Sequence, residues 1–158
     1  MTETQADRQP LIADPDAPRQ GGTQRVVTEV AVGILIRADG AFLLTTRPAG
    51  KAYAGYWEFP GGKLEANESV EQALQRELHE ELGIVIGAVT PWKVEIVDYP
   101  HALVRLHFCK VFAWEGELQM REAQTFAWEQ LPVQVQPILA GTVPVLHWLA
   151  QERATAAA

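Results

Sequence analysis

The stretch that decides the fold covers residues 62–84 and reads GKLEANESVEQALQRELHEELGI. Its second half predicts a helix, because Ser69 and Gln72 can form a capping box at the start and Gly83 supplies a left-handed stop at the end. At helical spacing one side is apolar, and we expect that side to be buried. It holds Val70, Ala73, Leu74, Leu78 and Leu82, whereas the opposite, solvent side holds Gln72, Gln75, Arg76 and His79.

Three carboxylates lie within or beside the apolar side of this helix, on Glu77, Glu80 and Glu81. Like charges at this spacing repel one another by about 0.2–0.5 kcal/mol per pair, and by more where water is excluded. A hard divalent cation would offset the repulsion, and carboxylate oxygens suit magnesium or manganese. The alternative is a solvated acidic face with Arg76 as a local ion-pair partner. The position of the acids within the apolar stripe favours the metal site.

The same stretch is similar to a known family motif. It resembles the Nudix box at every fixed position, which here are Gly62, Glu68, Arg76, Glu77, Leu78, Glu80, Glu81, Gly83 and Ile84. Other segments resemble the MutT branch of that family, the 8-oxo-dGTP diphosphatases; these are residues 30–36, 46–47, 57–63 and 114–117. The resemblance covers roughly residues 26–150.

The hydrophobic pattern outside the box predicts strands and a terminal helix. A first strand over 26–36 turns at 38–40 into a second over 42–46, which we expect to form a hairpin. Further strands are expected over 57–59, 103–114 and 125–129, and the segment 84–98 is strand-rich but interrupted by Pro91; another hairpin is expected at 115–117 and a C-terminal helix over 142–150. Pattern alone indicates an α+β chain. The resemblance implies the Nudix fold, a mixed β-sheet sandwiched between helices in an α/β/α arrangement.

Composition limits the classes of protein. The chain has 158 residues and 47% hydrophobic content, which fit one domain with a packed core. We divide it into a mobile arm at 1–25, rich in proline and glycine, a Nudix domain at 26–152 and a tail at 153–158. The sole cysteine, Cys109, lies in an apolar run and predicts a buried structural thiol.

Charge and hydropathy limit the partners that the chain can have. A net charge of −7 and a sequence pI near 5.1 argue against a basic surface that follows a nucleic-acid polymer. A mononucleotide that arrives with its metal remains compatible. The chain has no signal peptide and no apolar run of about 18 residues, so we expect a cytoplasmic protein that binds no membrane. The sequence does not indicate an oligomeric state.

The resemblance also assigns roles outside the helix. It implies a substrate-binding Arg47, nucleotide contacts from Glu58, Phe59, Pro60 and Gly61, with Phe59 near the base, and a further metal carboxylate at Glu122. The Gly61 carbonyl is a plausible metal ligand, since glycine allows close backbone approach. For Glu122 the alternative is a surface charge beside Arg121. Thr142 stands where MutT-like proteins carry an asparagine that reads the oxidised purine, and one hydroxyl replaces an amide there. Base selectivity therefore stays open.

These residues predict metal-assisted hydrolysis of a nucleoside triphosphate to the monophosphate and pyrophosphate. Glu77, Glu80, Glu81 and the Gly61 carbonyl would hold Mg²⁺ or Mn²⁺, which neutralises charge in the transition state. Glu77 is the first candidate for the general base and Glu80 the second, while Arg76 orients a carboxylate. Two alternatives remain: a Nudix hydrolase for a nucleotide sugar or a dinucleotide, and a Nudix-fold binding module without catalysis.

Overall fold

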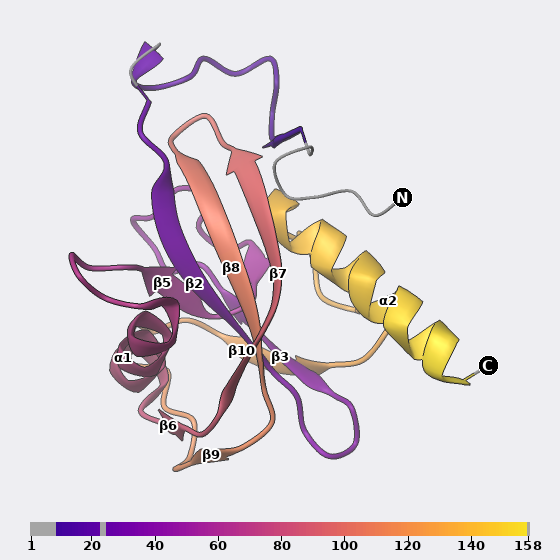
Figure 1. Cartoon of the computed structure of the whole chain (residues 1–158). Coiled ribbons are helices and arrows are strands. Elements are labelled where there is room, and N and C mark those ends of the chain that lie inside the picture. Colours follow the sequence, from indigo (N-terminus) through magenta and orange to yellow (C-terminus); the bar gives the residue numbers. More distant parts are fainter. Residues whose placement is uncertain (1–8, 23–24, 158) are drawn as a thin grey trace.

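The computed structural model describes residues 9–22 and 25–157, and its largest sheet has five strands in the order β1-β7-β8-β2-β5. The strands are β1 (Leu11–Ile12), β7 (Val89–Asp98), β8 (Leu103–Val111), β2 (Thr28–Leu35) and β5 (Gly61–Lys63). The sheet is mixed, because β1 with β7 and β2 with β8 are parallel pairs whereas the other neighbours are antiparallel. The run predicted as a central strand is β8, which lies between β7 and β2 (Figure 1).

A second sheet has the order β10-β3-β4, with β10 (Phe126–Glu129), β3 (Phe42–Thr46) and β4 (Trp57–Glu58). The hairpin expected between residues 26 and 46 is wrong in part, because β2 and β3 belong to different sheets and share only the bridge between Ile36 and Phe42. A local turn fixes where the chain reverses. It does not fix the partner that each strand finds.

The hairpin expected at 115–117 is also wrong. Strand β9 (Trp114–Glu115) pairs with β6 (Val85–Ile86), a strand nearly thirty residues earlier in the chain. The strand-rich segment 84–98 forms two strands, β6 and β7, but the gap between them lies at residues 87–88, and β7 continues through Pro91 with a register shift between Pro91 and Lys93. Proline lacks the donor that a regular ladder needs, which accounts for the irregularity.

Helix α1 (Val70–Leu82) has the predicted caps. The Gln72 amide donates to Ser69 Oγ at 3.1 Å, the Ser69 amide donates to the Gln72 side chain at 2.9 Å, and Gly83 adopts φ 72°. Its buried side packs against one face of the large sheet in a cluster that includes Ala73, Leu74, Leu78, Leu82, Ala31 and Leu35. The buried stripe read from the sequence is thus confirmed, with Val70 at its half-buried edge.

Helix α2 (Val143–Ala157) covers the opposite face and follows a short 3₁₀ turn at Ala140–Thr142 (Figure 1). Val145 and Leu149 pack there with Val32, Ile34 and Phe108. The two helices on opposite faces confirm the α/β/α arrangement. The helix runs on through the segment expected to be a tail, so residues 153–157 continue α2.

Part of the expected N-terminal arm is docked on the sheet. Leu11–Ile12 form β1 at the edge of the large sheet, and Ala13 is 5% exposed. Residues 9–22 therefore form a docked segment, the alternative to a mobile arm, and residues 1–8 and 23–24 lie outside the described residues.

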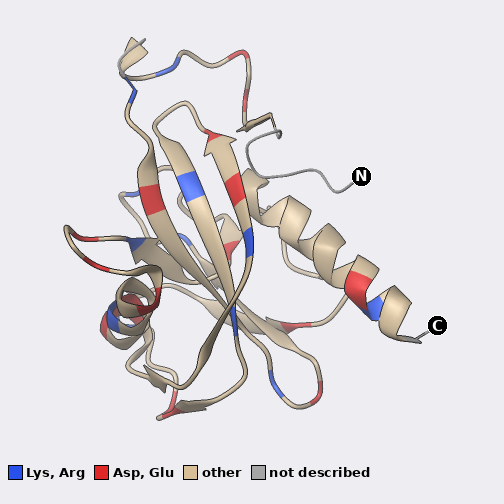
Figure 2. Cartoon of the chain, viewed as in Figure 1, with Lys and Arg blue, Asp and Glu red and all other residues tan. Residues whose placement is uncertain are grey.

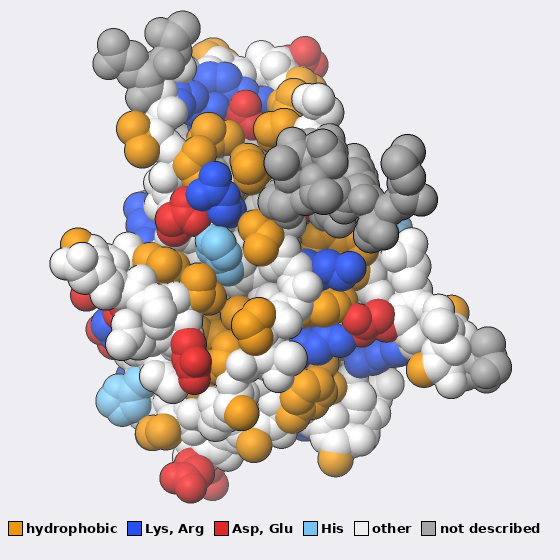
Figure 3. Space-filling model, viewed as in Figure 1, with side chains coloured by type: hydrophobic (Ala, Val, Ile, Leu, Met, Phe, Trp, Pro, Cys, Tyr) orange, Lys and Arg blue, Asp and Glu red, His pale blue; other side chains and the backbone are white. Residues whose placement is uncertain are grey.

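Surface and core agree with the composition. Along the ribbon of Figure 2, Lys and Arg positions are scattered among Asp and Glu positions, without a continuous basic segment in the coloured part of the chain. In the same view Figure 3 shows hydrophobic side chains gathered over the strands of the large sheet. Burial raises the pKa of Cys109 to about 11, as expected of a structural thiol. Among the described residues, no helix is long and apolar enough to cross a membrane.

Candidate active site

A cavity of about 620 Å³ lies beside α1 and brings together nearly all the residues predicted for the site. Those that line it are Arg47, Glu58, Phe59, Pro60, Gly61, Glu77, Glu80, Glu81, Glu122 and Thr142. Arg76 does not line it. Residues more than ninety positions apart in the chain thus meet at one cavity.

The glycines of β5 let a carboxylate approach the backbone. Gly62 pairs with Ala31 of β2, and a Cβ atom at Gly62 would lie 2.3 Å from Cδ of Glu77. Any larger residue at 62 would therefore push the Glu77 carboxylate aside. The preceding residue, Gly61, is as closely packed, because its Cβ would lie 2.0 Å from the Ala31 carbonyl oxygen. The two glycines thus allow β5 to lie close to β2 and to the Glu77 side chain of α1.

Glu81 carries the most perturbed carboxylate of the site. It is 9% exposed, and it forms no ion pair with the part of the chain that the structure describes. Burial, together with the nearby charges of Glu122, Glu77 and Glu58, raises its pKa to about 9. Carboxylates from α1, β4 and the segment before β10 therefore crowd one place. A cation at this place would relieve their repulsion.

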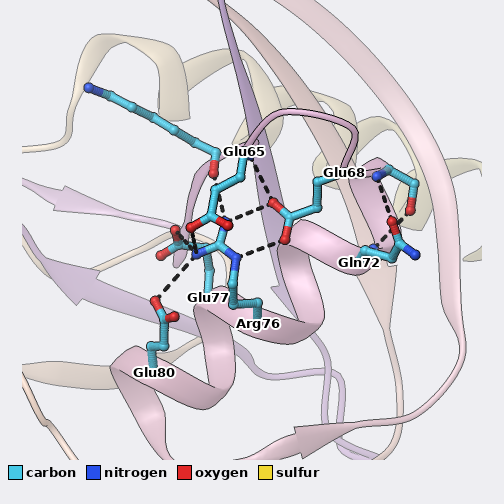
Figure 4. A network of polar contacts seen from close by, with 8 residues as sticks. Glu65, Glu68, Gln72, Arg76, Glu77 and Glu80 are labelled. Carbon is cyan, nitrogen blue, oxygen red and sulfur yellow. Dashed lines mark hydrogen bonds and ion pairs between the residues drawn. The ribbon is translucent and has the colours of Figure 1, made fainter.

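Arg76 organises the outer side of the acidic cluster (Figure 4). Its guanidinium donates to both oxygens of Glu68 at 2.8 Å, to Glu77 at 2.8 Å, to Glu80 at 3.3 Å and to the Lys63 carbonyl at 3.0 Å. The hydrogen bonds to Glu68 and Glu77 raise the pKa of Arg76. The side chain is thus half-buried under the 63–68 loop, and is not fully on the solvent side that helical spacing indicated. Ion pairing with the carboxylates is the role that the sequence analysis gave it.

Arg47 is held by the protein at one wall of the cavity. Its Nη1 donates to both oxygens of Glu58, at 3.1 and 3.0 Å, and its Nε donates to the Ala52 carbonyl at 2.6 Å. Burial raises the pKa of Glu58, and the Arg47 guanidinium opposes that rise. A phosphate would therefore compete with Glu58 for this guanidinium, a contact that the sequence did not reveal.

Glu122 lines the cavity, and contacts of Arg121 and Gln124 fix the chain around it. Arg121 donates from its backbone to the Glu81 carbonyl at 3.1 Å and from Nη1 to the His79 carbonyl at 3.0 Å, which turns it toward the end of α1. The side chain of Gln124, 8% exposed, accepts from the Glu122 amide at 3.0 Å. Gln124 also lines the cavity, and sequence analysis missed it because a lone glutamine in a loop gives no signal.

The far end of the cavity is aromatic, and the sequence analysis missed it too. Tyr99 and His101 line it, with ring centroids 5.2 Å apart. The Tyr99 hydroxyl accepts from the Gly141 amide at 2.9 Å, next to the buried Thr142. The turn after β7 is thereby joined to the segment that precedes α2. An aromatic residue two positions before a histidine in a turn was the available signal.

Comparison with known proteins decides the family. The model of the NUDIX domain matches residues 27–149. This chain belongs to the Nudix family. The 8-oxo-dGTP diphosphatase of Haemophilus influenzae is 36% identical over 127 residues, which are 80% of this chain and 93% of that protein. The CTP pyrophosphohydrolase of Escherichia coli is 38% identical over 117 residues, 73% of this chain and 87% of that protein.

A solved structure agrees with these relatives. The solution structure of the Escherichia coli ORF135 protein has a TM-score of 0.70 and 36% sequence identity, and the match covers 83% of this chain and 94% of that one. The chain is therefore a MutT-like Nudix pyrophosphohydrolase.

Nudix proteins typically depend on a divalent metal, and the donors in this Nudix cavity are compatible with one. They are carboxylate and carbonyl oxygens, and Glu81 is buried among other acids without a counter-ion in the described chain. Within residues 9–22 and 25–157, no group of three or more acidic, histidine or cysteine side chains is placed to hold a metal ion by itself. Magnesium is commonly held by one or two carboxylates together with substrate phosphates and water. An open acidic cluster suits that mode.

Proposed function

We propose that the protein is a Mg²⁺-dependent nucleoside triphosphate pyrophosphohydrolase. It converts an oxidised deoxynucleoside triphosphate such as 8-oxo-dGTP to the monophosphate and pyrophosphate, and so cleans the nucleotide pool of the cytoplasm. The supporting observation is the crowded carboxylate cluster at the cavity, with the pKa of Glu81 raised to about 9 by burial and by its acidic neighbours. An acidic cluster of this kind favours hydrolysis at phosphorus over simple nucleotide binding.

The residues of the cavity and of α1 have three roles, which are metal binding, proton transfer and positioning. Glu77, Glu80, Glu81 and the Gly61 carbonyl would hold magnesium, or manganese in its place, with Glu122 as a further ligand. When bound, the metal neutralises phosphate charge and lowers the pKa of water. The proton of the attacking water passes to a carboxylate, for which Glu77 is the first candidate and Glu80 the second. Arg76 is a positioning residue, because it holds Glu77 and Glu80 from behind.

The rest of the cavity binds the substrate. Arg47 binds the phosphates, and its contact with Glu58 keeps the guanidinium in place until substrate arrives. Glu58, Phe59, Pro60 and Gly61 line the path toward the base, and Thr142 lies at its end. Phe59 is 3% exposed and packs on Phe42, so it offers a rigid apolar edge.

A second candidate substrate is a pyrimidine triphosphate. The observation that favours it is Thr142, because one hydroxyl oxygen replaces the separate donor and acceptor atoms of an asparagine amide. The similarity to a CTP pyrophosphohydrolase, at 38% identity, points the same way. A nucleotide sugar or a dinucleotide is a further alternative substrate.

A substrate panel tests these choices. The purified protein is given Mg²⁺ and each of 8-oxo-dGTP, dGTP, CTP, the other canonical triphosphates and two nucleotide sugars, and pyrophosphate and monophosphate are measured separately. The proposal expects 8-oxo-dGTP to lead in kcat/KM and pyrophosphate to be released. A lead by CTP would select the second candidate. Failure to hydrolyse any of these compounds would contradict the proposal.

A further inference from the structure

The N-terminal segment at residues 9–22 lies outside the part of the chain that matches the Nudix model, which begins at residue 27. The segment nevertheless extends the large sheet, because Leu11 pairs with Val97 and Ile12 with Asp98. In Figure 1 it then passes across the turn between β7 and β8 toward the start of β2. We call it the N-terminal brace.

The brace holds the turn that carries the aromatic end of the cavity. The Ala13 amide donates to the Asp98 carbonyl at 2.9 Å, and the Gln20 amide donates to the Pro100 carbonyl at 2.8 Å. The Arg19 guanidinium lies 3.6 Å from the Asp98 carboxylate. Three contacts from the brace thus fix residues 98–100, which include Tyr99 and directly precede His101.

Just after the brace, Arg25 reinforces the same place. Its guanidinium donates to the Asp98 carboxylate and to the Tyr99 carbonyl. Asp98 therefore receives one arginine from within the brace and one from the segment that leads into β2. The backbone of Tyr99 is held directly, whereas its hydroxyl is bonded to Gly141.

The brace also holds the 47–56 loop. The Tyr53 hydroxyl donates to the Asp14 carboxylate, and burial together with this bond raises the pKa of Tyr53 to about 12. The Tyr53 ring lies 5.7 Å from that of Tyr99 and 5.8 Å from that of His101, between centroids. This loop contributes Lys51 and Ala52 to the cavity wall.

Packing joins these supports into one unit. Ala13 lies in a buried hydrophobic cluster with Val97, Tyr99, Val104 and Leu139, and Tyr53 is packed against it. Of these, Tyr99, Val104 and Leu139 also line the cavity. The cluster therefore packs behind the aromatic residues that line the cavity, and Ala13 of the brace is part of this cluster.

We propose that the N-terminal brace positions the nucleobase end of the active site, with Asp14 and Arg19 as positioning residues that hold the 47–56 loop and the 98–102 turn. The inference rests on the proposed function, since it assigns the base to the aromatic end of the cavity and the phosphates to the acidic end. The brace touches none of the carboxylates of α1. It therefore affects how the base is bound and leaves the chemical step alone.

Steady-state kinetics with 8-oxo-dGTP test the assignment in the full chain, with Tyr53→Phe and Asp14→Asn as the variants. Asparagine suits residue 14, where φ is 47°. Loss of one hydrogen bond is expected to raise KM about threefold to tenfold and to change kcat less than about twofold. Inhibition by 8-oxo-dGMP weakens likewise, and by a larger factor than inhibition by pyrophosphate, because Arg47 of the same loop keeps its hydrogen bonds to Glu58. The double variant is no worse than the stronger single one, because both changes break one bond.

Matched controls come from the same two segments. Tyr56→Phe removes a hydroxyl from the 47–56 loop, and Asp16→Asn removes a charge from the brace; neither side chain makes a polar contact with the described part of the chain. Both controls should keep the KM of the wild type. An unchanged KM in Tyr53→Phe and Asp14→Asn, or a fall in kcat at constant KM, would overturn the proposal.

Amide hydrogen exchange without substrate separates this proposal from the proposed function. Faster exchange over residues 98–102 and 139–141 in Tyr53→Phe than in Tyr56→Phe supports the brace, even if the wild type hydrolyses no triphosphate. Equal exchange in the two variants overturns the brace, whatever the enzyme hydrolyses. Arg19→Gln gives a second measurement, since it weakens the contact with Asp98 and should speed exchange over 98–102 as well.

Discussion

At the scale of single residues, substitutions at two adjacent glycines should affect different properties, catalysis at Gly62 and stability at Gly61. A Cβ at Gly62 would meet the carboxylate of Glu77, the end of a flexible side chain, whereas a Cβ at Gly61 would meet the backbone carbonyl of Ala31. The first conflict can be relieved by moving Glu77. The second can be relieved only by moving a strand of the large sheet. The same substitution should thus have different consequences at neighbouring positions.

Gly62→Ala is expected to lower kcat by about a hundredfold, because an ångström-scale displacement of a group that acts on the substrate can cost that much. The Tm should fall only slightly, since the Glu77 side chain can swing away. Activity assays and thermal melts check both points. Gly61→Ala is the comparison and should lower the Tm much more. Wild-type activity in a folded Gly62→Ala protein would remove Glu77 from the chemistry.

Glu80→Gln is expected to lower kcat by roughly two to four orders of magnitude while the fold stays intact, if Glu80 binds the metal or takes the proton. Its side chain is 57% exposed and its ion pair with Arg76 is at 3.3 Å, so the loss of stability should be small. Turnover of 8-oxo-dGTP and circular dichroism are the measurements. Glu71→Gln, on an exposed part of the same helix, should keep full activity. Full activity in Glu80→Gln would contradict its role.

At the scale of elements, α1 and the loop before it form one unit. The capping box at Ser69 starts the helix, and the paired guanidinium of Arg76 ties Glu68 and the Lys63 carbonyl to the helix surface. This contact holds β5, and with it the cavity wall, beside the carboxylates. The loop therefore supports the site although it does not line the cavity apart from its first residues.

The pH dependence of stability should report this contact. Hydrogen bonds from Arg76 and from the Glu65 amide lower the pKa of Glu68 to about 2, from an ordinary value of 4.5. Because the folded pKa is the lower one, the stabilisation is present above pH 4.5 and is lost as the pH falls toward 2. Glu68→Gln should thus lower the free energy of unfolding at neutral pH, and its difference from wild type should shrink below pH 4.5.

Urea titrations of wild type and variant across that range measure the difference. Glu117→Gln is the control, because this exposed side chain makes no hydrogen bond within the described chain, and its difference from wild type should be small throughout. A Glu68→Gln difference that does not change with pH would show that the charge of Glu68 contributes nothing to stability.

The elements also show what sequence can predict. The caps and apolar stripe of α1 are local, so both its ends and its buried side follow from residues 69–83. The partners of β3 and β9 depend on contacts far along the chain, and a run of apolar residues does not specify them. The hydrogen bonds between Arg47 and Glu58 could not be predicted for the same reason. Features set by residues close together in the sequence could be predicted, whereas pairing between distant segments could be seen only in the structure.

At the scale of the whole molecule, the cavity has an acidic end and an aromatic end on one scaffold. A chain of net charge −7 must bind a polyanion next to its own carboxylates. Arg47, Lys51 and Lys63 line the same cavity and supply part of the positive charge. The buried Glu81 and its neighbours need a cation before they can all be ionised at neutral pH. Metal binding and substrate binding should therefore depend on each other, and both should stabilise the folded protein.

Mg²⁺ is accordingly expected to raise the Tm of the substrate-free protein. A ligand at about a hundred times its Kd adds about 2.7 kcal/mol to the free energy of unfolding. For a domain of this size that corresponds to roughly 5–10 °C. Melting in EDTA, in MgCl₂ and in NaCl of equal ionic strength separates binding from screening. Glu81→Gln should lose most of the shift, because it removes a buried donor, whereas Glu117→Gln should keep it. Equal Tm values in EDTA and in saturating MgCl₂ would show that the carboxylates alone bind no metal, and that substrate phosphates must complete the site.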